Sequence, residues 1–273
     1  MSKKGLFNQI LIVLIALMVF GCNKEYKKAL KSEEWKVKYD AAFKFYEKKD
    51  YYRSIILFDQ ILPIIRGTEQ AEKANFYYAY AHFNDKQYIT SAHFFKQFYV
   101  IYSRSEYALE AEYMYAYSLY QQSPAYTLDQ NPTYEAITAM QTFLNKYPYS
   151  EYTEKANKII DALQVKLEKK AADSSKEYLK LRRYKSALVA LKNFQKDYPD
   201  SDYNEEIRFL EIEAAFLLAE QSISSKQKER YQNTVDLYLS YIDRYENSSY
   251  VKTAGDYYTK SLESIKKLTS KNQ

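Results

Sequence analysis

A six-residue pattern, Tyr-x-x-Ser-x-Tyr, occurs four times in this chain: YSRSEY at 102–107, YPYSEY at 147–152, YPDSDY at 198–203 and YENSSY at 245–250. The copies begin 45, 51 and 47 residues apart, a spacing typical of solenoids built from pairs of helices. The serine of each copy is a good helix N-cap, and in three copies an acidic residue follows it, which suits the positive end of a helix dipole. We predict that each copy marks the joint between one helix pair and the next and that its tyrosines pack this joint.

Two positions upstream of each joint recur as well. A small residue stands eleven positions before the first tyrosine and a large aromatic residue stands four positions before it, so the two share one helix face. These residues are Ser91, Ala136, Ala187 and Thr234, and Phe98, Phe143, Phe194 and Tyr241. Pro148 and Pro199 then end the helix in two copies. The arrangement resembles the tetratricopeptide repeat, and four glycines and five prolines in 273 residues leave few helix breakers. We expect an all-α fold, a tetratricopeptide-repeat superhelix (α-solenoid) of about five helix pairs.

Aromatic residues recur on the first helices of the first three pairs. When the small residues of the second helices, Ser54, Ser91 and Ala136, are taken as equivalent, alanines fall at the close-packing position of the first helices. These alanines, Ala42, Ala79 and Ala116, are 37 residues apart. In the same register, aromatic residues repeat at positions i, i+4 and i+7 and form what we call the aromatic stripe. Its nine members are Tyr39, Phe43, Tyr46, Phe76, Tyr80, Phe83, Tyr113, Tyr117 and Tyr120. In tetratricopeptide folds this face lines the concave side, so the resemblance makes the stripe a candidate site for a partner or cargo.

The aromatic stripe has two interpretations. Aromatic residues at helical spacing often form core, and in a solenoid each helix buries two faces. A groove is favoured because other residues, Ala42, Phe45 and Leu119 among them, already supply the face between helices. Tyrosine also suits a wet surface that holds apolar cargo, since its ring offers contact area and its hydroxyl tolerates water. The sequence leaves both interpretations open.

The N-terminus has the features of an export signal. Lys3 and Lys4 precede an apolar run from Leu6 to Phe20, which is too short to span a membrane comfortably, and polar residues follow Cys22 at once. The residues before Cys22 resemble the bacterial lipobox, and as the only cysteine Cys22 can form no internal disulfide. We predict cleavage before Cys22 and lipidation of this residue, palmitate included. The alternatives are an export signal without lipidation and an uncleaved apolar anchor.

The charge of the chain argues against nucleic acid as a partner. Its formal net charge is +5, and removal of residues 1–21 takes away two lysines and no acid, which leaves +3. Lysines and glutamates are interspersed along the chain rather than gathered, as expected for solvated helix faces.

No catalytic or metal-binding pattern occurs in the sequence. His82 and His93, the only histidines, fall on different predicted helices and lack a metal-ligand spacing. Gly-rich phosphate loops, nucleophile elbows and Cys/His pairs are also missing from the sequence. We expect a protein that is not an enzyme and that holds no metal and no cofactor apart from the N-terminal lipid on Cys22.

The predicted organisation has five parts. Residues 1–21 are the signal peptide, 22–33 a lipidated tether, 34–150 repeats one to three with the candidate cargo groove, 151–265 repeats four and five as candidate partner-binding repeats, and 266–273 a polar tail. We expect a loop between Tyr120 and Pro132 and an uninterrupted helix from Tyr152 to about Ala172. A second insertion, Ser222 to Glu229, is expected to loosen repeat five, and the tail from Ser264 is expected to fray.

A lipoprotein of about 250 mature residues with five such pairs resembles the BamD family of the β-barrel assembly machinery of the bacterial outer membrane. The resemblance is most specific at Tyr113-Met114-Tyr115, at the stretch from Asn131 through Ala136 to Phe143, and at the joints 147–152 and 198–203. It implies a lipid-anchored scaffold on the periplasmic face of the outer membrane that takes part in protein insertion into the membrane. The implied partners are a BamA-like barrel-forming subunit, bound mainly by the C-terminal repeats, and unfolded outer-membrane proteins, whose final targeting strand meets the N-terminal repeats.

Two other classes of lipoprotein compete with this interpretation. One is a tetratricopeptide lipoprotein that organises cell-wall synthesis or envelope division, which only a list of binding partners would separate. The other is a glycan-binding lipoprotein of the starch-utilisation type. Members of that class are about twice as long and carry large loop insertions, and many have an acidic stretch after the cysteine, whereas this chain has Asn23-Lys24-Glu25.

Overall fold

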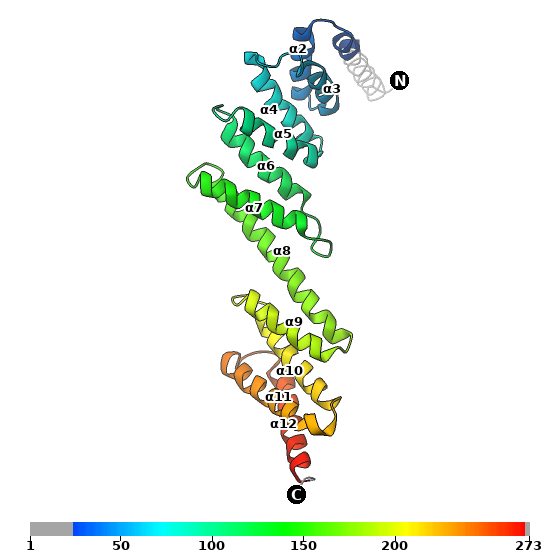
Figure 1. Cartoon of the computed structure of the whole chain (residues 1–273), viewed down its shortest axis with the longest axis vertical. Coiled ribbons are helices and arrows are strands. Elements are labelled where there is room, and N and C mark those ends of the chain that lie inside the picture. The colour runs from blue at the N-terminus through cyan, green and yellow to red at the C-terminus, as the bar shows by residue number, and fades with distance from the viewer. Residues whose placement is uncertain (1–23, 271–273) are drawn as a thin grey trace, which may run out of the picture. The chain divides into compact units, whose positions relative to one another are not determined.

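The described chain is entirely helical, in agreement with the predicted fold class. The structure is a computed structural model that describes residues 24–270, and no strand occurs among them (Figure 1). The helices are α2 (Trp35–Glu47), α3 (Tyr51–Ile61), α4 (Glu69–Asn84), α5 (Tyr88–Ile101), α6 (Ala108–Gln122), α7 (Asn131–Lys146), α8 (Thr153–Lys180), α9 (Tyr184–Asp197), α10 (Asn204–Glu220), α11 (Ser224–Arg244) and α12 (Val251–Ser270). They form consecutive tetratricopeptide-like pairs from α2/α3 to α10/α11, and α12 packs on the last pair.

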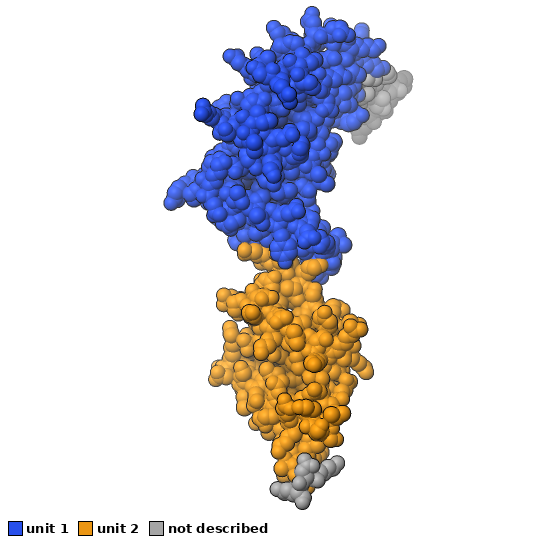
Figure 2. Space-filling view, viewed as in Figure 1, with its two compact units in different colours: residues 1–161 blue, residues 162–273 orange. Residues whose placement is uncertain are grey.

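The chain divides into two compact units, Met1–Asp161 and Ala162–Gln273 (Figure 2). The division lies eleven residues beyond the predicted boundary at 150, because α8 is one continuous helix that belongs to both units. Ala156 and Ile160 near its start join the core of the first unit, whereas Ala172 joins the core of the second. The uninterrupted helix expected from Tyr152 to about Ala172 therefore exists and continues to Lys180.

Small residues allow the two helices of each pair to approach closely. In the first pair the Ser54 hydroxyl donates a hydrogen bond to the carbonyl oxygen of Ala42 at 2.9 Å. Small residues also let successive pairs approach, since Ser91 Oγ of α5 lies 3.1 Å from Ser118 Oγ of α6. Every small residue that the register placed at a close-packing position is fully buried: Ala42, Ser54, Ala79, Ser91, Ala116, Ala136, Ala187 and Thr234.

Three pairs share the same tight turn between their helices. Lys49, Lys86 and Arg182 occupy equivalent positions in these turns and have positive φ angles of 61°, 61° and 55°. In each turn the next residue donates its backbone N–H to a carbonyl five positions back, as from Gln87 to His82 at 2.9 Å. This is the left-handed helix ending that usually takes glycine, so three long basic side chains hold a backbone conformation that is unfavourable for them.

The joints are packed by their tyrosines, as predicted. The first tyrosine of every copy contacts the aromatic residue four positions before it: Phe98–Tyr102, Phe143–Tyr147, Phe194–Tyr198 and Tyr241–Tyr245, with ring centroids 5.0 to 5.3 Å apart. The second tyrosine stacks on the preceding first helix in three copies: Tyr107 on Phe76 at 4.5 Å, Tyr152 on Tyr113 at 4.3 Å and Tyr250 on Phe209 at 4.6 Å. Each joint therefore ties two successive pairs together.

The serine of the joint acts one turn earlier than predicted. The α-helices begin three residues after it, at Ala108, Thr153, Asn204 and Val251. In three copies the serine hydroxyl accepts the backbone N–H of the second tyrosine, as from Tyr107 to Ser105 at 3.0 Å. Its carbonyl oxygen accepts the N–H of the first helical residue. The serine thus caps the turn that leads into the helix rather than the helix itself.

The insertion in repeat three is a loop, as expected, between the end of α6 at Gln122 and the start of α7 at Asn131. The expected loosening at Ser222–Glu229 is wrong, since α11 already begins at Ser224. Helix-forming Lys, Gln and Glu residues outweigh the serines there. The tail from Ser264 is likewise helical, and α12 continues to Ser270.

The tether predicted for residues 22–33 also differs from the structure. Residues 24–30 form a helix that packs on the first pair through Tyr26, Ala29 and Leu30, because these apolar side chains fall on one helix face. The predicted signal peptide and the lipidation site Cys22 lie outside the described residues.

Candidate functional site

The aromatic stripe lies on α2, α4 and α6, three residues on each helix. Phe76 and Tyr113 are buried, with 4% and 6% of their surface exposed, and the other seven residues are half-buried. The two buried residues are the ones on which the joint tyrosines stack. The stripe therefore has a core edge and a partly exposed edge, and cargo binding by the exposed edge stays a prediction.

Ring contacts join the stripe across the three helices. Phe83 on α4 meets Tyr117 on α6 with centroids 5.6 Å apart. Tyr77 on α4 bridges to α2, at 5.1 Å from both Phe43 and Tyr46. Ring contacts thus link α2 to α4 and α4 to α6, in two groups that both include residues of α4. The first holds Tyr39, Phe43, Tyr46, Phe76 and Tyr80, and the second holds Phe83, Tyr113, Tyr117 and Tyr120.

Sequence reasoning missed Tyr77, although it joins the first two helices of the stripe. The equivalent positions on α2 and α6 hold Asp40 and Met114. Recurrence between repeats therefore carries no signal for this residue, and only the packing of α2 against α4 reveals it.

The hydroxyl groups of the stripe are neutral hydrogen-bonding groups. Tyr80 donates to the Glu110 carboxylate of α6, and burial together with this carboxylate raises the pKa of Tyr80. Asn84 Nδ2 donates to Tyr46 Oη at 3.2 Å, and burial raises the pKa of Tyr46 to about 12. Burial also raises the pKa of Tyr113 to about 12. At neutral pH these phenols carry no charge, so they can bind a ligand through ring contacts and hydrogen bonds.

The stripe opens into a shallow pocket where α2 meets α4. Phe43, Tyr46 and Tyr77 line it together with Tyr51, and its volume is about 350 Å³. The ammonium group of Lys73, which also lines the pocket, lies 5.2 Å from the centroid of the Phe43 ring. Lys49 and Glu47 line the pocket as well, so the site offers aromatic surface edged by two cations and one carboxylate. This suits an apolar or aromatic group that carries a carboxylate nearby.

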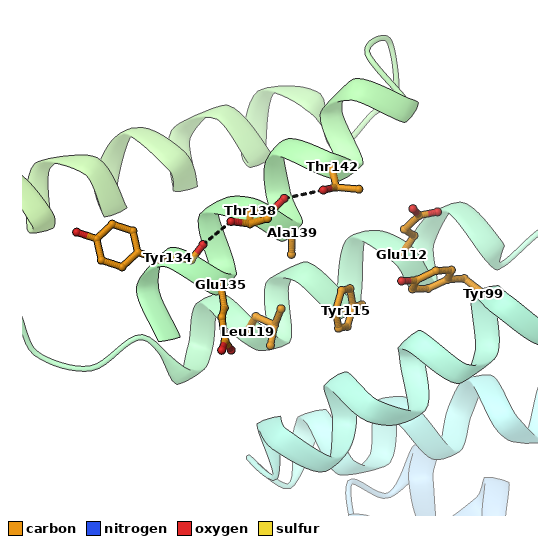
Figure 3. Close-up of a pocket in the computed structure, with 9 residues that line it drawn as sticks. All are labelled: Tyr99, Glu112, Tyr115, Leu119, Tyr134, Glu135, Thr138, Ala139 and Thr142. Atoms are coloured by element: carbon orange, nitrogen blue, oxygen red, sulfur yellow. Dashed lines mark hydrogen bonds between the residues drawn. The ribbon is translucent and has the colours of Figure 1, made fainter. Parts of the chain in front are cut away.

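A larger pocket of about 470 Å³ lies between α5, α6 and α7 and contains no member of the stripe (Figure 3). Tyr99, Tyr115 and Tyr134 contribute rings to its lining. Glu112 at its edge is paired with Lys146 at 2.6 Å and accepts a hydrogen bond from Tyr147 at 3.1 Å. This carboxylate is therefore satisfied within the protein. The other charged residue of the lining is Glu135, which is exposed, so the charge that this pocket offers a ligand is negative, whereas the pocket of the stripe has lysines.

Comparison with known families identifies the class of protein. The model of a family of outer membrane lipoproteins, YfiO, matches residues 31–233, which takes in the aromatic stripe and three of the four joints. The chain belongs to this family. No curated protein matches it.

Two further findings concern the chemistry of this outer membrane lipoprotein. His82 lies on α4 and His93 on α5, and within residues 24–270 no group of three or more His, Cys, Asp or Glu side chains is arranged to hold a metal ion. None of the helices in that range is both long and apolar enough to cross a membrane.

Proposed function

We propose that this outer membrane lipoprotein is the BamD-like scaffold of the β-barrel assembly machinery. In this role it is anchored by lipid on Cys22 at the periplasmic face of the outer membrane. It binds a BamA-like barrel subunit with repeats four and five and the targeting strand of unfolded outer-membrane proteins with the aromatic stripe. Its work is binding rather than catalysis.

The aromatic stripe, whose ring contacts link α2 to α4 and α4 to α6, is the observation that carries the proposal. Its pocket of phenol and phenyl rings with Lys73 at the edge suits a segment that ends in an aromatic residue and a free carboxylate, as the last strand of a barrel protein does. Ring contacts worth roughly 0.5–1.5 kcal/mol each would hold such a segment weakly and allow its release.

A peptide-binding experiment tests the cargo role. The peptide copies the final strand of an outer-membrane barrel protein, and a second peptide has its terminal aromatic residue replaced by serine. We expect Tyr46→Ala/Tyr117→Ala to weaken binding of the first peptide by about 5- to 100-fold, the loss of two ring contacts. Tyr80 is a poorer choice for truncation, because it packs on Phe95 and is bonded to Glu110.

The matched control is Tyr238→Ala/Tyr258→Ala, which removes a stacked pair of half-buried tyrosines outside the stripe, with centroids 4.6 Å apart. This variant should bind the peptide as the parent protein does. Unchanged affinity in a well-folded stripe variant would exclude cargo binding by this surface.

The partner role needs a separate test, a pull-down from detergent-solubilised membranes. Co-purification of a barrel protein with periplasmic domains supports the proposal. Recovery of cell-wall synthesis or division proteins in its place would favour the competing scaffold function, and recovery of glycan would favour the glycan-binding class.

A further inference from the structure

The helix over residues 24–30 has two different faces. Lys24, Lys27, Lys28 and Lys31 stand at positions i, i+3, i+4 and i+7, so they share one side, which we call the basic stripe. All four side chains are exposed. The residues matched by the family begin at 31, so this helix precedes them.

The opposite face fixes the helix to the first pair. Ala29 is buried, and Tyr26 meets Phe45 of α2 edge to face with centroids 5.6 Å apart. The guanidinium of Arg53 on α3 lies 5.2 Å from the Tyr26 ring centroid. Because the helix is held by both α2 and α3, its lysines point in a fixed direction relative to the first pair.

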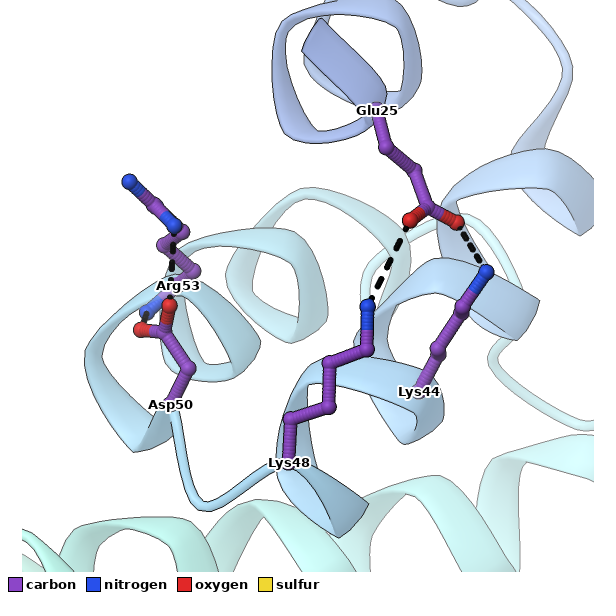
Figure 4. A network of polar contacts seen from close by, with 5 residues as sticks. All are labelled: Glu25, Lys44, Lys48, Asp50 and Arg53. Carbon is purple, nitrogen blue, oxygen red and sulfur yellow. Dashed lines mark hydrogen bonds and ion pairs between the residues drawn. The ribbon is translucent and has the colours of Figure 1, made fainter. Parts of the chain in front are cut away.

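The single acidic residue of this helix is turned inward. Glu25 reaches toward α2, where it pairs with Lys44 and, at 3.5 Å, with Lys48 (Figure 4). The hydrogen bond from Lys44 lowers the pKa of Glu25, so the carboxylate stays ionised. Because Glu25 points toward α2, no acidic side chain of this helix lies on the same face as the basic stripe. The two lysines that pair with Glu25 add further basic groups beside that face.

Positive charge is concentrated in this part of the protein. Between Lys24 and Arg53 there are ten basic and six acidic residues, a formal charge of +4. The rest of the mature chain after removal of residues 1–21 has 28 basic and 29 acidic residues. The near-neutral total therefore hides a basic N-terminal end.

The position of Cys22 indicates what this end meets. Only Asn23 separates Cys22 from Lys24, and two residue spacings extend at most about 7 Å. The stripe itself rises about 10 Å along the helix axis. A lipid on Cys22 would therefore hold Lys24 within about one Debye length of the lipid headgroups, and the whole basic stripe lies that close when the helix runs along the membrane surface.

We propose that the basic stripe docks on the anionic phospholipid headgroups of the membrane that carries the anchor. The lipid and the four lysines then act as two attachments, and they fix the orientation of the first helix pair at the surface. This inference rests on the proposed lipidation of Cys22. An acidic protein is the competing occupant, but the short covalent distance to the anchor favours the membrane.

Vesicle co-sedimentation tests the proposal with the full mature chain carrying Cys22→Ser, which removes the lipid. We expect binding to vesicles with about 30% phosphatidylglycerol, little binding to phosphatidylcholine vesicles, and loss of binding at about 0.5 M NaCl. Replacement of Lys24, Lys27, Lys28 and Lys31 by glutamine should lower the partition coefficient by about 600-fold, since each lysine near an anionic surface contributes roughly fivefold. The control replaces Lys192, Lys196, Lys228 and Lys252 of the second unit by glutamine and should bind as the parent does.

Equal binding by the basic-stripe variant and the control would overturn the proposal. Equal binding to both kinds of vesicle would overturn it as well. Either result would leave an acidic protein as the occupant of the basic stripe. Circular dichroism of both variants checks that they are folded. The assay contains no lipid anchor, cargo peptide or barrel subunit. If vesicle binding fails while peptide binding succeeds, only the docking inference falls, and the reverse result removes only the cargo role.

Discussion

At the residue scale, His82 shows how closely the aromatic packing constrains a titratable group. It is 5% exposed and lies stacked on Phe94, and Tyr78 contacts both of these rings. Its Nδ1 is 2.8 Å from Gln87 Oε1, and its Nε2 has no hydrogen-bond partner among the described residues. Burial lowers the pKa of His82, because the cost of burying a charged imidazolium among rings outweighs the attraction of Asp59 and Asp85.

This environment predicts a loss of stability in mild acid. The unfolded chain takes up a proton on this histidine below about pH 6.5, whereas the folded protein resists it until lower pH. The contribution of neutral His82 to the free energy of unfolding is therefore complete above about pH 6.5. It is lost as the pH falls, with a slope of at most about 1.4 kcal/mol per pH unit. Thermal unfolding of His82→Gln between about pH 7.5 and 5 should show a smaller decline than the parent.

The second histidine supplies the control for this measurement. His93 is exposed on α5, so His93→Gln should keep the parental pH dependence. Glu211, whose pKa is raised by burial, acts with the opposite sign but is common to all three proteins. A parental curve for His82→Gln would show that His82 contributes nothing to the decline.

The stacked tyrosines at the joints predict a measurable pairwise energy. Tyr152 and Tyr113 are nearly parallel, with centroids 4.3 Å apart. In a double-mutant cycle with Tyr152→Leu and Tyr113→Leu, we expect a coupling energy of about 0.5–1.5 kcal/mol in denaturant unfolding. Tyr149 of the same joint is 98% exposed, so Tyr149→Leu should change stability by less than about 0.5 kcal/mol. Additive losses at Tyr152 and Tyr113 would contradict the joint packing described above.

At the scale of elements, the small residues between paired helices set how close the helices lie. Ala187 is fully buried in α9 and belongs to the core of the second unit. Ala187→Leu should overpack this contact and lower the free energy of unfolding by about 1–3 kcal/mol, measured by thermal or denaturant unfolding. Lys192→Leu on the exposed side of α9 should have almost no effect, and equal melting of the two variants would mean that the register is wrong.

The sequence predicts the helices and joints well because both depend on local repetition. Small residues and aromatic residues recur at fixed offsets, so the pairs, the loop before Asn131 and the ring contacts of the joints could all be inferred. The parts that could not be inferred depend on contacts without a repeat. Tyr77 has no aromatic equivalent in the other pairs, and residues 24–30 are ordered by the first pair rather than by their own composition.

The candidate site was predictable as a surface but not in its detail. The nine residues of the aromatic stripe follow from the register, whereas the burial of Phe76 and Tyr113 follows from the joint tyrosines that stack on them. The polar groups that finish the site, Glu110 for Tyr80 and Asn84 for Tyr46, come from neighbouring helices. A single helix pattern contains no information about such partners.

At the scale of the whole molecule, the chain belongs to a family of outer membrane lipoproteins, so the first property to test is its attachment to the membrane. We expect Cys22→Ala to yield a form that is released from the membrane or that retains its signal. Mass spectrometry of the purified parent should find lipid on Cys22 as the first residue. An unmodified mature start at another residue would exclude this anchor.

Because the joint hexapeptide recurs between successive helix pairs, whole pairs could be deleted or duplicated between two of its copies. The first tyrosine of each copy contacts the aromatic residue four positions before it. The second tyrosine stacks on an aromatic residue of the preceding first helix in three copies, at Phe76, Tyr113 and Phe209. An in-frame deletion that joined residue 101 to residue 147 would bring Tyr152 onto Phe76 in place of Tyr107, one ring replacing another of the same kind. Recombination between the joints whose second tyrosine meets an aromatic residue could therefore lengthen or shorten this protein by whole pairs, and the new joint would keep its ring contacts.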